Sequence, residues 1–252
     1  MKLVTFNIRY DCGQDGINNF SFRKNFILDK LKKEQPDIIC FQEVLPHVAQ
    51  WLREALWDTH YVVGCPREAA LDGEQTCVAF DPRKFNLMKM DTFWLSETPW
   101  VPGSRYPGQS ICPRVCTHLL LRENSSGQVF RLMNTHLDHE GAQVRVRSVE
   151  QIMSAVSREA FFPDAPLILT GDFNAEPDSP EIQFLERQPG VSIPSKSVGM
   201  TFHNFGKGPK CQIDYIVIRG NIRCSQVEKW TDHRDAVYLS DHYPVCAQLI
   251  FQ

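Results

Sequence analysis

The chain has 252 residues, of which 42% are hydrophobic and 23% charged, a composition typical of a globular protein with a large apolar core. Its net charge is -3, so it lacks the overall positive charge that holds nucleic acid by counterion release, and any phosphate binding must be local. The N-terminal segment lacks the apolar core of a signal peptide and no 18-residue apolar run occurs, which predicts a cytoplasmic protein without membrane insertion.

The elements predicted from periodicity and turn residues alternate along the chain. The expected strands are residues 2–8, 36–43, 76–80, 86–95, 115–123, 129–137, 166–171, 212–218 and 243–251. The expected helices are residues 21–33, 47–56 and 141–160, with a short one after Ser179-Pro180. No linker or low-complexity stretch interrupts this order, and the length permits one large domain or two small ones.

The segment 96–109 is a long loop rich in Pro and Gly. Long loops in compact domains are often functional, although many are only connections. Its aromatic residues Trp100 and Tyr106 are expected to stack on a base or a sugar of the substrate.

Nine cysteines are present, an odd number, and several lie inside apolar runs such as DIICF and PVCAQL. Buried free thiols in a reducing compartment are the simplest interpretation. Cys112 and Cys116 have no second pair at zinc-site spacing, so no zinc site is predicted.

A weak internal repeat concerns the polar residues at strand ends. In the first half, a strand ends at Asn7, a helix follows, and a second strand ends at Glu43. In the second half, the corresponding ends are His136 and Asp172. Because sites of α/β proteins gather at the carboxyl ends of strands, these four side chains are predicted to meet at one edge.

Each candidate also has an ordinary structural explanation when taken alone. Glu43 follows a buried strand, where a carboxylate is costly unless it is paired or binds a metal such as Mg²⁺. Asp172 can orient or deprotonate water and Asn174 can hold a phosphate oxygen, but both are also common turn residues. His136 is as compatible with a structural role as with a catalytic one.

Two further acidic positions accompany a histidine near the end of the chain. Asp214 lies in QIDYIVI, and Asp241 directly precedes His242 in LSDHYPV. A carboxylate next to an imidazole raises its basicity, so a charged His242 is expected to stabilise or protonate a phosphate oxygen. The alternative is a polar loop before the last strand.

Taken together and in this order, the blocks TFNIR, FQEV, NTHL, GDFNAEPDS, IDYI and SDHYPV resemble the endonuclease/exonuclease/phosphatase superfamily. This superfamily includes pancreatic deoxyribonuclease, apurinic endonucleases, neutral sphingomyelinases, inositol-polyphosphate 5-phosphatases and nocturnin. The resemblance covers residues 3 to about 250, and TFNIRYD, FWLSETPWVPGS and NTHLDHEG are similar to a bacterial branch close to the nocturnin and deadenylase group.

The resemblance implies a deoxyribonuclease-like α/β/β/α sandwich, with two mixed sheets face to face and helices outside, which forms a single domain over residues 1–252. It also implies in-line attack of water on a phosphate ester with the help of Mg²⁺ or Mn²⁺. The implied metal site comprises Glu43, Asn7 and Asp241. Glu74, Asp11, His139 and Arg145 match the bacterial branch as residues that shape the pocket.

The resemblance further assigns roles to the remaining candidates. Asp172 activates the water, and His242 with its partner Asp214 stabilises charge on phosphorus. The implied phosphate-binding residues are Asn174, His136 and Arg114, and His136 is also a candidate general acid.

The predicted function is a Mg²⁺- or Mn²⁺-dependent hydrolase of phosphomonoesters or phosphodiesters of a small molecule or nucleotide. Its acidic balance argues against a stable complex with duplex DNA, and a nuclease on short single-stranded nucleic acid is the alternative enzyme. A catalytically silent binding protein of the same fold and a zinc-dependent hydrolase are further alternatives. Oligomeric state and substrate identity are not predicted.

Overall fold

The computed structural model describes residues 1–252, and its elements follow the predicted order. Twelve strands form two sheets: β1 (Lys2–Asn7), β2 (Ile38–Gln42), β3 (Tyr61–Val63), β4 (Val78–Phe80), β5 (Phe85–Trp94), β6 (Val115–Glu123), β7 (Val129–His136), β8 (Leu167–Asp172), β9 (Val191–Ser192), β10 (Asp214–Arg219), β11 (Ile222–Lys229) and β14 (Val245–Phe251). A separate hairpin comprises β12 (His233–Arg234) and β13 (Val237–Tyr238). The helices are α1 (Phe20–Glu34), α2 (Pro46–Ala55), α3 (Ala142–Arg158) and α4 (Pro180–Glu186), with short 3₁₀ helices at Gly16–Asn18 and Pro194–Ser197.

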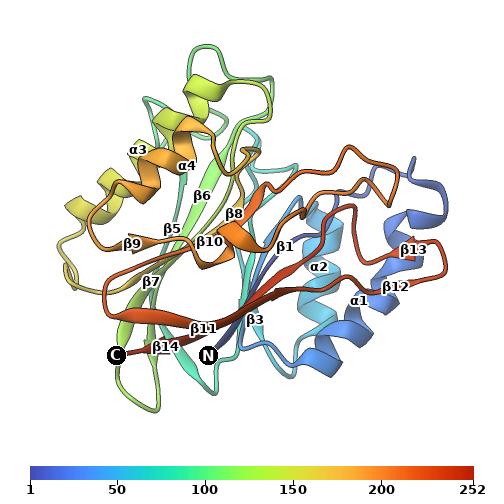
Figure 1. The fold of residues 1–252 in the computed structure, drawn as a ribbon, viewed down its shortest axis with the longest axis horizontal. Coiled ribbons are helices and arrows are strands. Elements are labelled where there is room, and N and C mark those ends of the chain that lie inside the picture. The colour runs from blue at the N-terminus through green and yellow to red at the C-terminus, as the bar shows by residue number, and fades with distance from the viewer.

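The two six-stranded sheets pack face to face between outer helices (Figure 1). One sheet has the order β11-β14-β1-β2-β4-β3 and the other β5-β6-β7-β8-β10-β9. Each contains one parallel pair, β1 with β2 and β7 with β8, among antiparallel neighbours. This arrangement confirms the predicted α/β/β/α sandwich.

Three hydrophobic clusters correspond to the three interfaces between these four layers. One joins α1 and α2 to the first sheet, with Phe6 and Phe41 facing Ile27 and Leu52. A second fills the space between the sheets, and a third joins α3 and α4 to the second sheet. The alternating side chains of each strand therefore supply two different layers of the core.

The same alternation decides where the polar strand ends point. In β7, Phe130 and Leu132 belong to the cluster between the sheets, so His136, on the same side of the strand, faces this layer too. In β8, Ile168 belongs to the same cluster between the sheets, and Asp172 lies on the same side of that strand. The candidate residues therefore meet at one edge of the space between the sheets, which confirms the convergence that the internal repeat predicted.

Polar side chains replace apolar ones as the layer between the sheets approaches this edge. The Gln42 amide donates to the Asn134 side chain, 2.7 Å away, and to Thr5 Oγ1. Thr170 Oγ1 also donates to Asn134 Oδ1, at 3.4 Å. This buried network connects the two parallel strand pairs directly behind the site, so movement of either sheet would disturb it.

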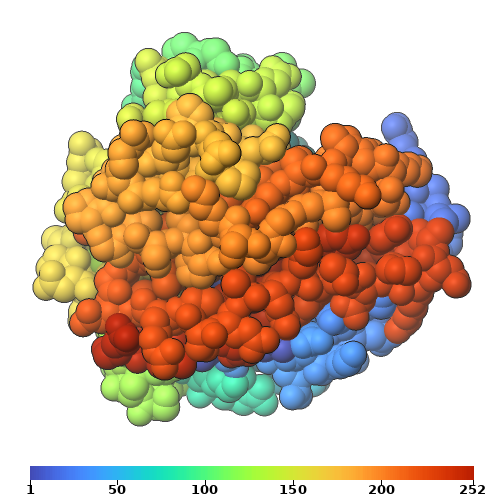
Figure 2. All heavy atoms as spheres, viewed as in Figure 1, coloured from blue at the N-terminus to red at the C-terminus, as the bar shows by residue number.

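Several elements have no counterpart in the sequence prediction. These are β3, β9, β11 and the β12–β13 hairpin. In β11 the exposed positions carry Arg223, Ser225, Gln226 and Glu228, and a bulge interrupts its register with β14. Figure 2 shows that C-terminal segments, orange to red, cover much of one face. None of the helices combines the length and the apolar character that crossing a membrane requires.

Candidate active site

Glu43 is held at the end of β2 by two hydrogen bonds. Its Oε1 accepts from the Asn7 amide at 2.9 Å, and its Oε2 accepts from the Tyr10 backbone N–H at 2.8 Å. Its φ of 62° lies in the left-handed region, which ends the strand and is sterically strained for a residue with a side chain. Strain of this kind at a polar residue is common in functional sites.

Asp172 lies at the centre of the site and is 2% exposed. It is paired in register with His136 of β7 on one side and with Asp214 of β10 on the other. Its Oδ2 accepts from the Asn7 amide at 2.9 Å, so Asn7 connects it to Glu43. Burial and the Asp214 carboxylate raise the pKa of Asp172 to about 7, although His242 opposes the shift.

His242 and Asp214 form a buried pair beside Asp172. The Nδ1 atom of His242 lies 2.8 Å from Asp214 Oδ2, and its Nε2 atom lies 3.7 Å from Asp172 Oδ2. Burial alone would lower the pKa of His242, but the surrounding carboxylates, Asp214 foremost, raise it well above the ordinary value. A charged imidazole therefore lies next to Asp172.

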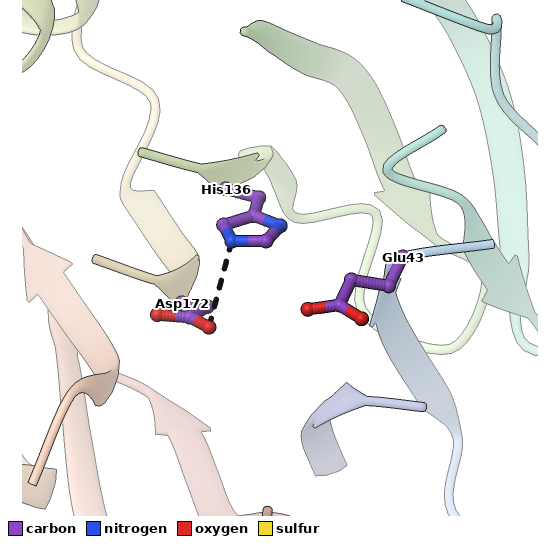
Figure 3. Close-up of side chains that lie close together, drawn as sticks. All are labelled: Glu43, His136 and Asp172. Atoms are coloured by element: carbon purple, nitrogen blue, oxygen red, sulfur yellow. Dashed lines mark ion pairs between the residues drawn. The ribbon is translucent and has the colours of Figure 1, made fainter. Parts of the chain in front are cut away.

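His136 has the opposite charge state. Burial, reinforced by the Arg114 guanidinium, lowers its pKa well below the ordinary value and leaves the imidazole neutral. Its Nε2 atom lies 3.6 Å from Asp172 Oδ2, and its buried Nδ1 atom has no hydrogen-bond partner. Figure 3 shows the ring of His136 and the carboxylates of Asp172 and Glu43 arranged around a common space.

Asp241, Asn174 and Arg114 surround this centre. Asp241 is buried, and its Oδ2 atom lies 3.7 Å from Arg9 Nε. Burial raises the pKa of the Asp241 carboxyl. The Asn174 amide donates to the Leu137 carbonyl, and its backbone N–H donates to Asp172 Oδ1. Arg114 is 3% exposed, and its Nε and Nη1 atoms have no hydrogen-bond partner.

A cavity of about 550 Å³ opens onto these residues. It is lined by Arg9, Tyr10, Glu43, Arg67, Glu74, Cys112, Arg114, His136, His139, Asp172, Asn174, Phe202, Asn204, Ile213, Asp241 and His242. Sequence reasoning did not identify Arg9, Arg67, Tyr10 or Phe202 as wall residues. Only Arg9 and Tyr10 carried a signal, because they directly follow the strand that ends at Asn7.

Of the four residues expected to shape the pocket, Glu74 and His139 line the cavity. Asp11 instead pairs with the exposed His47, and Arg145 pairs with Glu181 between α3 and α4. These two expectations are wrong because both side chains are taken up by partners outside the cavity.

The expectation that Trp100 and Tyr106 stack on the substrate at this site is also wrong. They line a different cavity of about 800 Å³, formed with α3 and the outer face of β5. The chain turns back after Trp94, whose backbone N–H donates to the Pro99 carbonyl oxygen. As a result, Trp100 and Tyr106 lie away from the polar strand ends. The cavity beside α3 contains none of the predicted catalytic residues.

The donor atoms present fit a divalent cation. The ligand atoms of Glu43, His136 and Asp172 lie within 4.8 Å of one another, and so do those of Asp172, Asp214 and His242. The first group suits a cation better, because His136 is neutral whereas His242 is charged and paired. Asn7 directs its amide nitrogen at both carboxylates, which makes it an orienting neighbour of this group.

A profile of the endonuclease/exonuclease/phosphatase family matches residues 4–242. The chain belongs to this family. The match includes every candidate site residue, from Asn7 to His242. The buried cluster of acidic and histidine side chains thus occupies a phosphoesterase fold, as the sequence resemblance implied.

Solved structures of family members cover the whole chain. A family protein from Bacteroides vulgatus is 29% identical with a TM-score of 0.93, and the match covers 100% of this chain and 98% of that one. A mannosyl-6-phosphatase from Bacteroides thetaiotaomicron is 25% identical with a TM-score of 0.90, and the match covers both chains fully.

The predicted likeness to the nocturnin group is also confirmed. Nocturnin from Drosophila melanogaster is 29% identical over 180 residues, which are 67% of this chain and 26% of that protein. The chain therefore spans about a quarter of the length of this relative, and the likeness concerns only the shared region.

Proposed function

We propose that the protein is a divalent-metal-dependent hydrolase that cleaves a phosphate ester of a small molecule by in-line attack of water. The observation that carries this proposal is the arrangement at Asp172. An acidic group with a raised pKa lies between a neutral histidine, His136, and a charged one, His242. Neighbouring groups with opposed charge states are typical of acid–base catalysis.

In this proposal Asp172 accepts a proton from the attacking water. A general base works best with a pKa near the operating pH, and the pKa of Asp172 is raised to about 7. The charged His242, oriented by Asp214 through its Nδ1 atom, stabilises the negative charge that grows on the phosphoryl oxygens. Neutral His136 donates a hydrogen bond to the phosphate, whereas the role of general acid suits the charged His242, which has a proton to release.

Asn174 and Arg114 complete phosphate binding. The Asn174 amide has one N–H bonded to Leu137 and a second available for a phosphate oxygen. The Nη1 atom of Arg114 has no protein partner, which leaves it available for a charge-assisted hydrogen bond to a phosphate oxygen.

Glu43, with Asn7 and Asp241 beside it, is proposed to hold Mg²⁺ or Mn²⁺, which leaves Asp172 free to act on water and His136 free to bind the phosphate. The bound cation would polarise the phosphoryl oxygen and neutralise its charge. Carboxylate oxygens dominate this set, which favours these hard cations over zinc.

A phosphomonoester of a sugar-like alcohol is the substrate class that the available observations favour. The cavity of about 550 Å³ suits a small ligand, and its walls are mostly polar. The structurally similar Bacteroides thetaiotaomicron protein is described as a mannosyl-6-phosphatase. A nuclease on short single strands is the second candidate, because Tyr10 and Phe202 offer aromatic faces in the same cavity.

The decisive experiment compares hydrolysis of hexose 6-phosphates, p-nitrophenyl phosphate, bis-p-nitrophenyl phosphate and a short single-stranded oligonucleotide with Mg²⁺, Mn²⁺ or EDTA. The proposal expects metal-dependent turnover, with monoesters preferred. Faster cleavage of the oligonucleotide would favour the nuclease. Metal binding without turnover of any ester would support the silent binding protein.

A further inference from the structure

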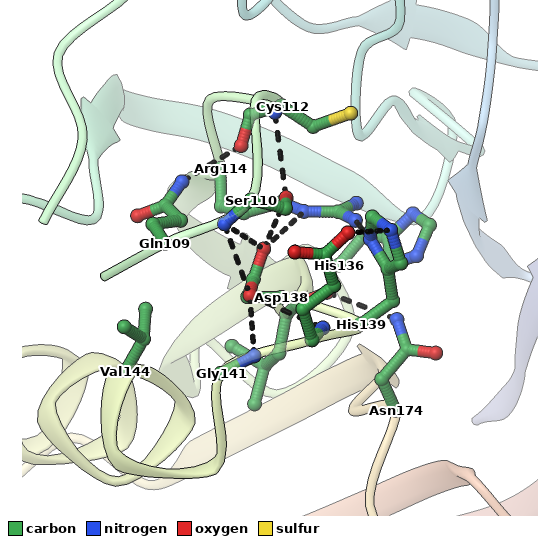
Figure 4. A network of polar contacts seen from close by, with 12 residues as sticks. Gln109, Ser110, Cys112, Arg114, His136, Asp138, His139, Gly141, Val144 and Asn174 are labelled. Carbon is green, nitrogen blue, oxygen red and sulfur yellow. Dashed lines mark hydrogen bonds and ion pairs between the residues drawn. The ribbon is translucent and has the colours of Figure 1, made fainter. Parts of the chain in front are cut away.

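The carboxylate of Asp138, two residues beyond the end of β7, forms the centre of a buried polar network (Figure 4). It is 0% exposed, and every contact it makes is with a donor. Ser110 donates through both its hydroxyl and its backbone N–H. The backbone N–H groups of Glu140 and Gly141 donate at 3.2 and 2.8 Å. A side chain that only accepts from so many donors behaves as an ionised carboxylate.

These contacts connect three segments beside the cavity: the loop before β6, the residues that follow β7, and the start of α3. Ser110 belongs to the loop before β6, which is also tied internally because Gln109 donates to the Cys112 carbonyl at 2.7 Å. Gly141 precedes the first residue of α3, and a Cβ there would lie 3.0 Å from the Gly108 carbonyl oxygen. The loop and the start of α3 therefore touch closely at Asp138.

The charged partner of this carboxylate is Arg114. Its Nε atom lies 3.9 Å from Asp138 Oδ1, and its Nη2 atom donates to His139 Nδ1 at 2.9 Å. The nearby carboxylate of Glu74 is already committed to Arg67, with two bonds of 2.8 and 3.0 Å. The carboxylate of Asp138 therefore compensates the positive charge of the buried Arg114 guanidinium. A buried charge without such a partner would be costly.

We propose that Asp138 is a positioning residue for phosphate recognition, which holds the Nε side of the Arg114 guanidinium so that Nη1, which has no protein partner, remains for the phosphate. Without the negative charge, Arg114 turns toward the other carboxylates nearby, Glu43 and Glu74. This inference rests on the proposed phosphate-binding role of Arg114 and extends it to the residue that sets its orientation.

The test is a double-mutant cycle with Asp138→Asn and Arg114→Ala. Asp138→Asn alone is expected to raise both KM and the inhibition constant of inorganic phosphate about tenfold, which lies within the usual coupling energy of two side chains in contact, with little change in kcat. In the Arg114→Ala background the same substitution is expected to have no further effect. Ser110→Ala is expected to raise KM and the inhibition constant of inorganic phosphate by a smaller factor than Asp138→Asn does.

Asp81→Asn is the matched control. Asp81 is also buried and accepts hydrogen bonds from an arginine, Arg83, but it follows β4 at the end that pairs with Ile38, away from the site. Its substitution is expected to leave both constants unchanged. An equal effect of Asp138→Asn with and without Arg114, or a loss of kcat alone, would overturn the positioning role and indicate general support of the fold.

Calorimetric titration with inorganic phosphate separates this inference from the proposed hydrolase activity. If no ester is hydrolysed but wild-type protein binds phosphate more tightly than the Asp138→Asn variant, the activity is refuted and the positioning role stands. If Asp138→Asn does not fold, Ser110→Ala supplies the comparison. Equal phosphate binding by variant and wild type, or no binding by wild type, would overturn the inference.

Discussion

At the scale of single residues, charge states distinguish the histidines and carboxylates of this site. Asp214 and Asp172 favour the charged form of His242, whereas burial and Arg114 favour the neutral form of His136. Two residues of one type therefore perform different tasks because their neighbours differ. The sequence identified both histidines but contained no information on which of them is charged.

Asp172→Asn is expected to abolish turnover and to stabilise the metal-free protein. Removal of a general base costs about 10²–10⁴-fold in kcat. Because folding raises the pKa of Asp172 to about 7, the fold loses stability progressively as the pH rises from about 4, the ordinary pKa of an aspartate, to about 7, and a neutral amide removes this cost. Thermal unfolding in EDTA at pH 8 should show a Tm higher by about 2–4 °C, equivalent to ~1 kcal/mol. At pH 5 the gain should be smaller, because the cost accumulates between about pH 4 and pH 7.

Asp214→Asn is expected to shift the alkaline limb of the pH–rate profile. Asp214 is the strongest cause favouring the charge of His242, so its loss should lower the pKa of that imidazole. Activity that requires charged His242 would then decline at a lower pH than in wild type. An unchanged alkaline limb together with a lower kcat would contradict this role for the pair.

At the scale of elements, strand alternation and strand pairing place the side chains. Asp172 lies opposite His136 and Asp214 because β7, β8 and β10 are neighbours with a fixed register. A shift of one residue in any of these strands would turn its functional side chain to the helix-covered face. The precision of the site thus depends on how closely β7 and β8 approach.

Gly171→Ala tests this dependence. Gly171 has a φ of 147°, and a Cβ there would lie 1.9 Å from the Thr135 carbonyl oxygen in β7. We expect a loss of about 3 kcal/mol or more in the free energy of unfolding, measured with urea, together with loss of activity. Gly127→Ala, at a left-handed turn with open space around it, should cost only about 1–2 kcal/mol and leave kcat unchanged. Similar effects of the two substitutions would show that the β7–β8 contact is not critical.

At the scale of the whole molecule, three apolar interfaces hold four layers together without a disulfide. All nine cysteines are free, as the sequence analysis predicted, and Cys40, Cys77, Cys116 and Cys246 are buried. Burial raises the pKa of these four thiols. The cytoplasmic location and the single-domain organisation stay predictions.

Thiol titration with Ellman's reagent checks the packing of these layers. In the native protein at pH 8, no more than the five partly exposed cysteines are expected to react, and all nine should react after denaturation. The Tm should be the same with and without a reducing agent, because no disulfide contributes to stability. Rapid reaction of all nine in the native state would show that the interfaces open easily.

The order of elements and the identity of the polar strand ends could be predicted from the sequence, because they depend on local periodicity and residue type. The long strands and helices have apolar runs or amphipathic repeats, as in residues 129–137 and 141–160. The strands β3 and β9 are too short to show a pattern. β11 was missed because its exposed side chains are polar and a bulge breaks its alternation.

The sequence by itself determined the alternation of strands and helices and the blocks that resemble the family, from Asn7 to His242. Only the tertiary structure decided that Arg67 and Tyr10 join the cavity wall while Trp100 leaves it. It also decided that Asp138 is the partner of Arg114. The physical reason is that periodicity acts between neighbours in the chain, whereas cavity walls, ion pairs and charge states depend on burial between segments that are distant in sequence.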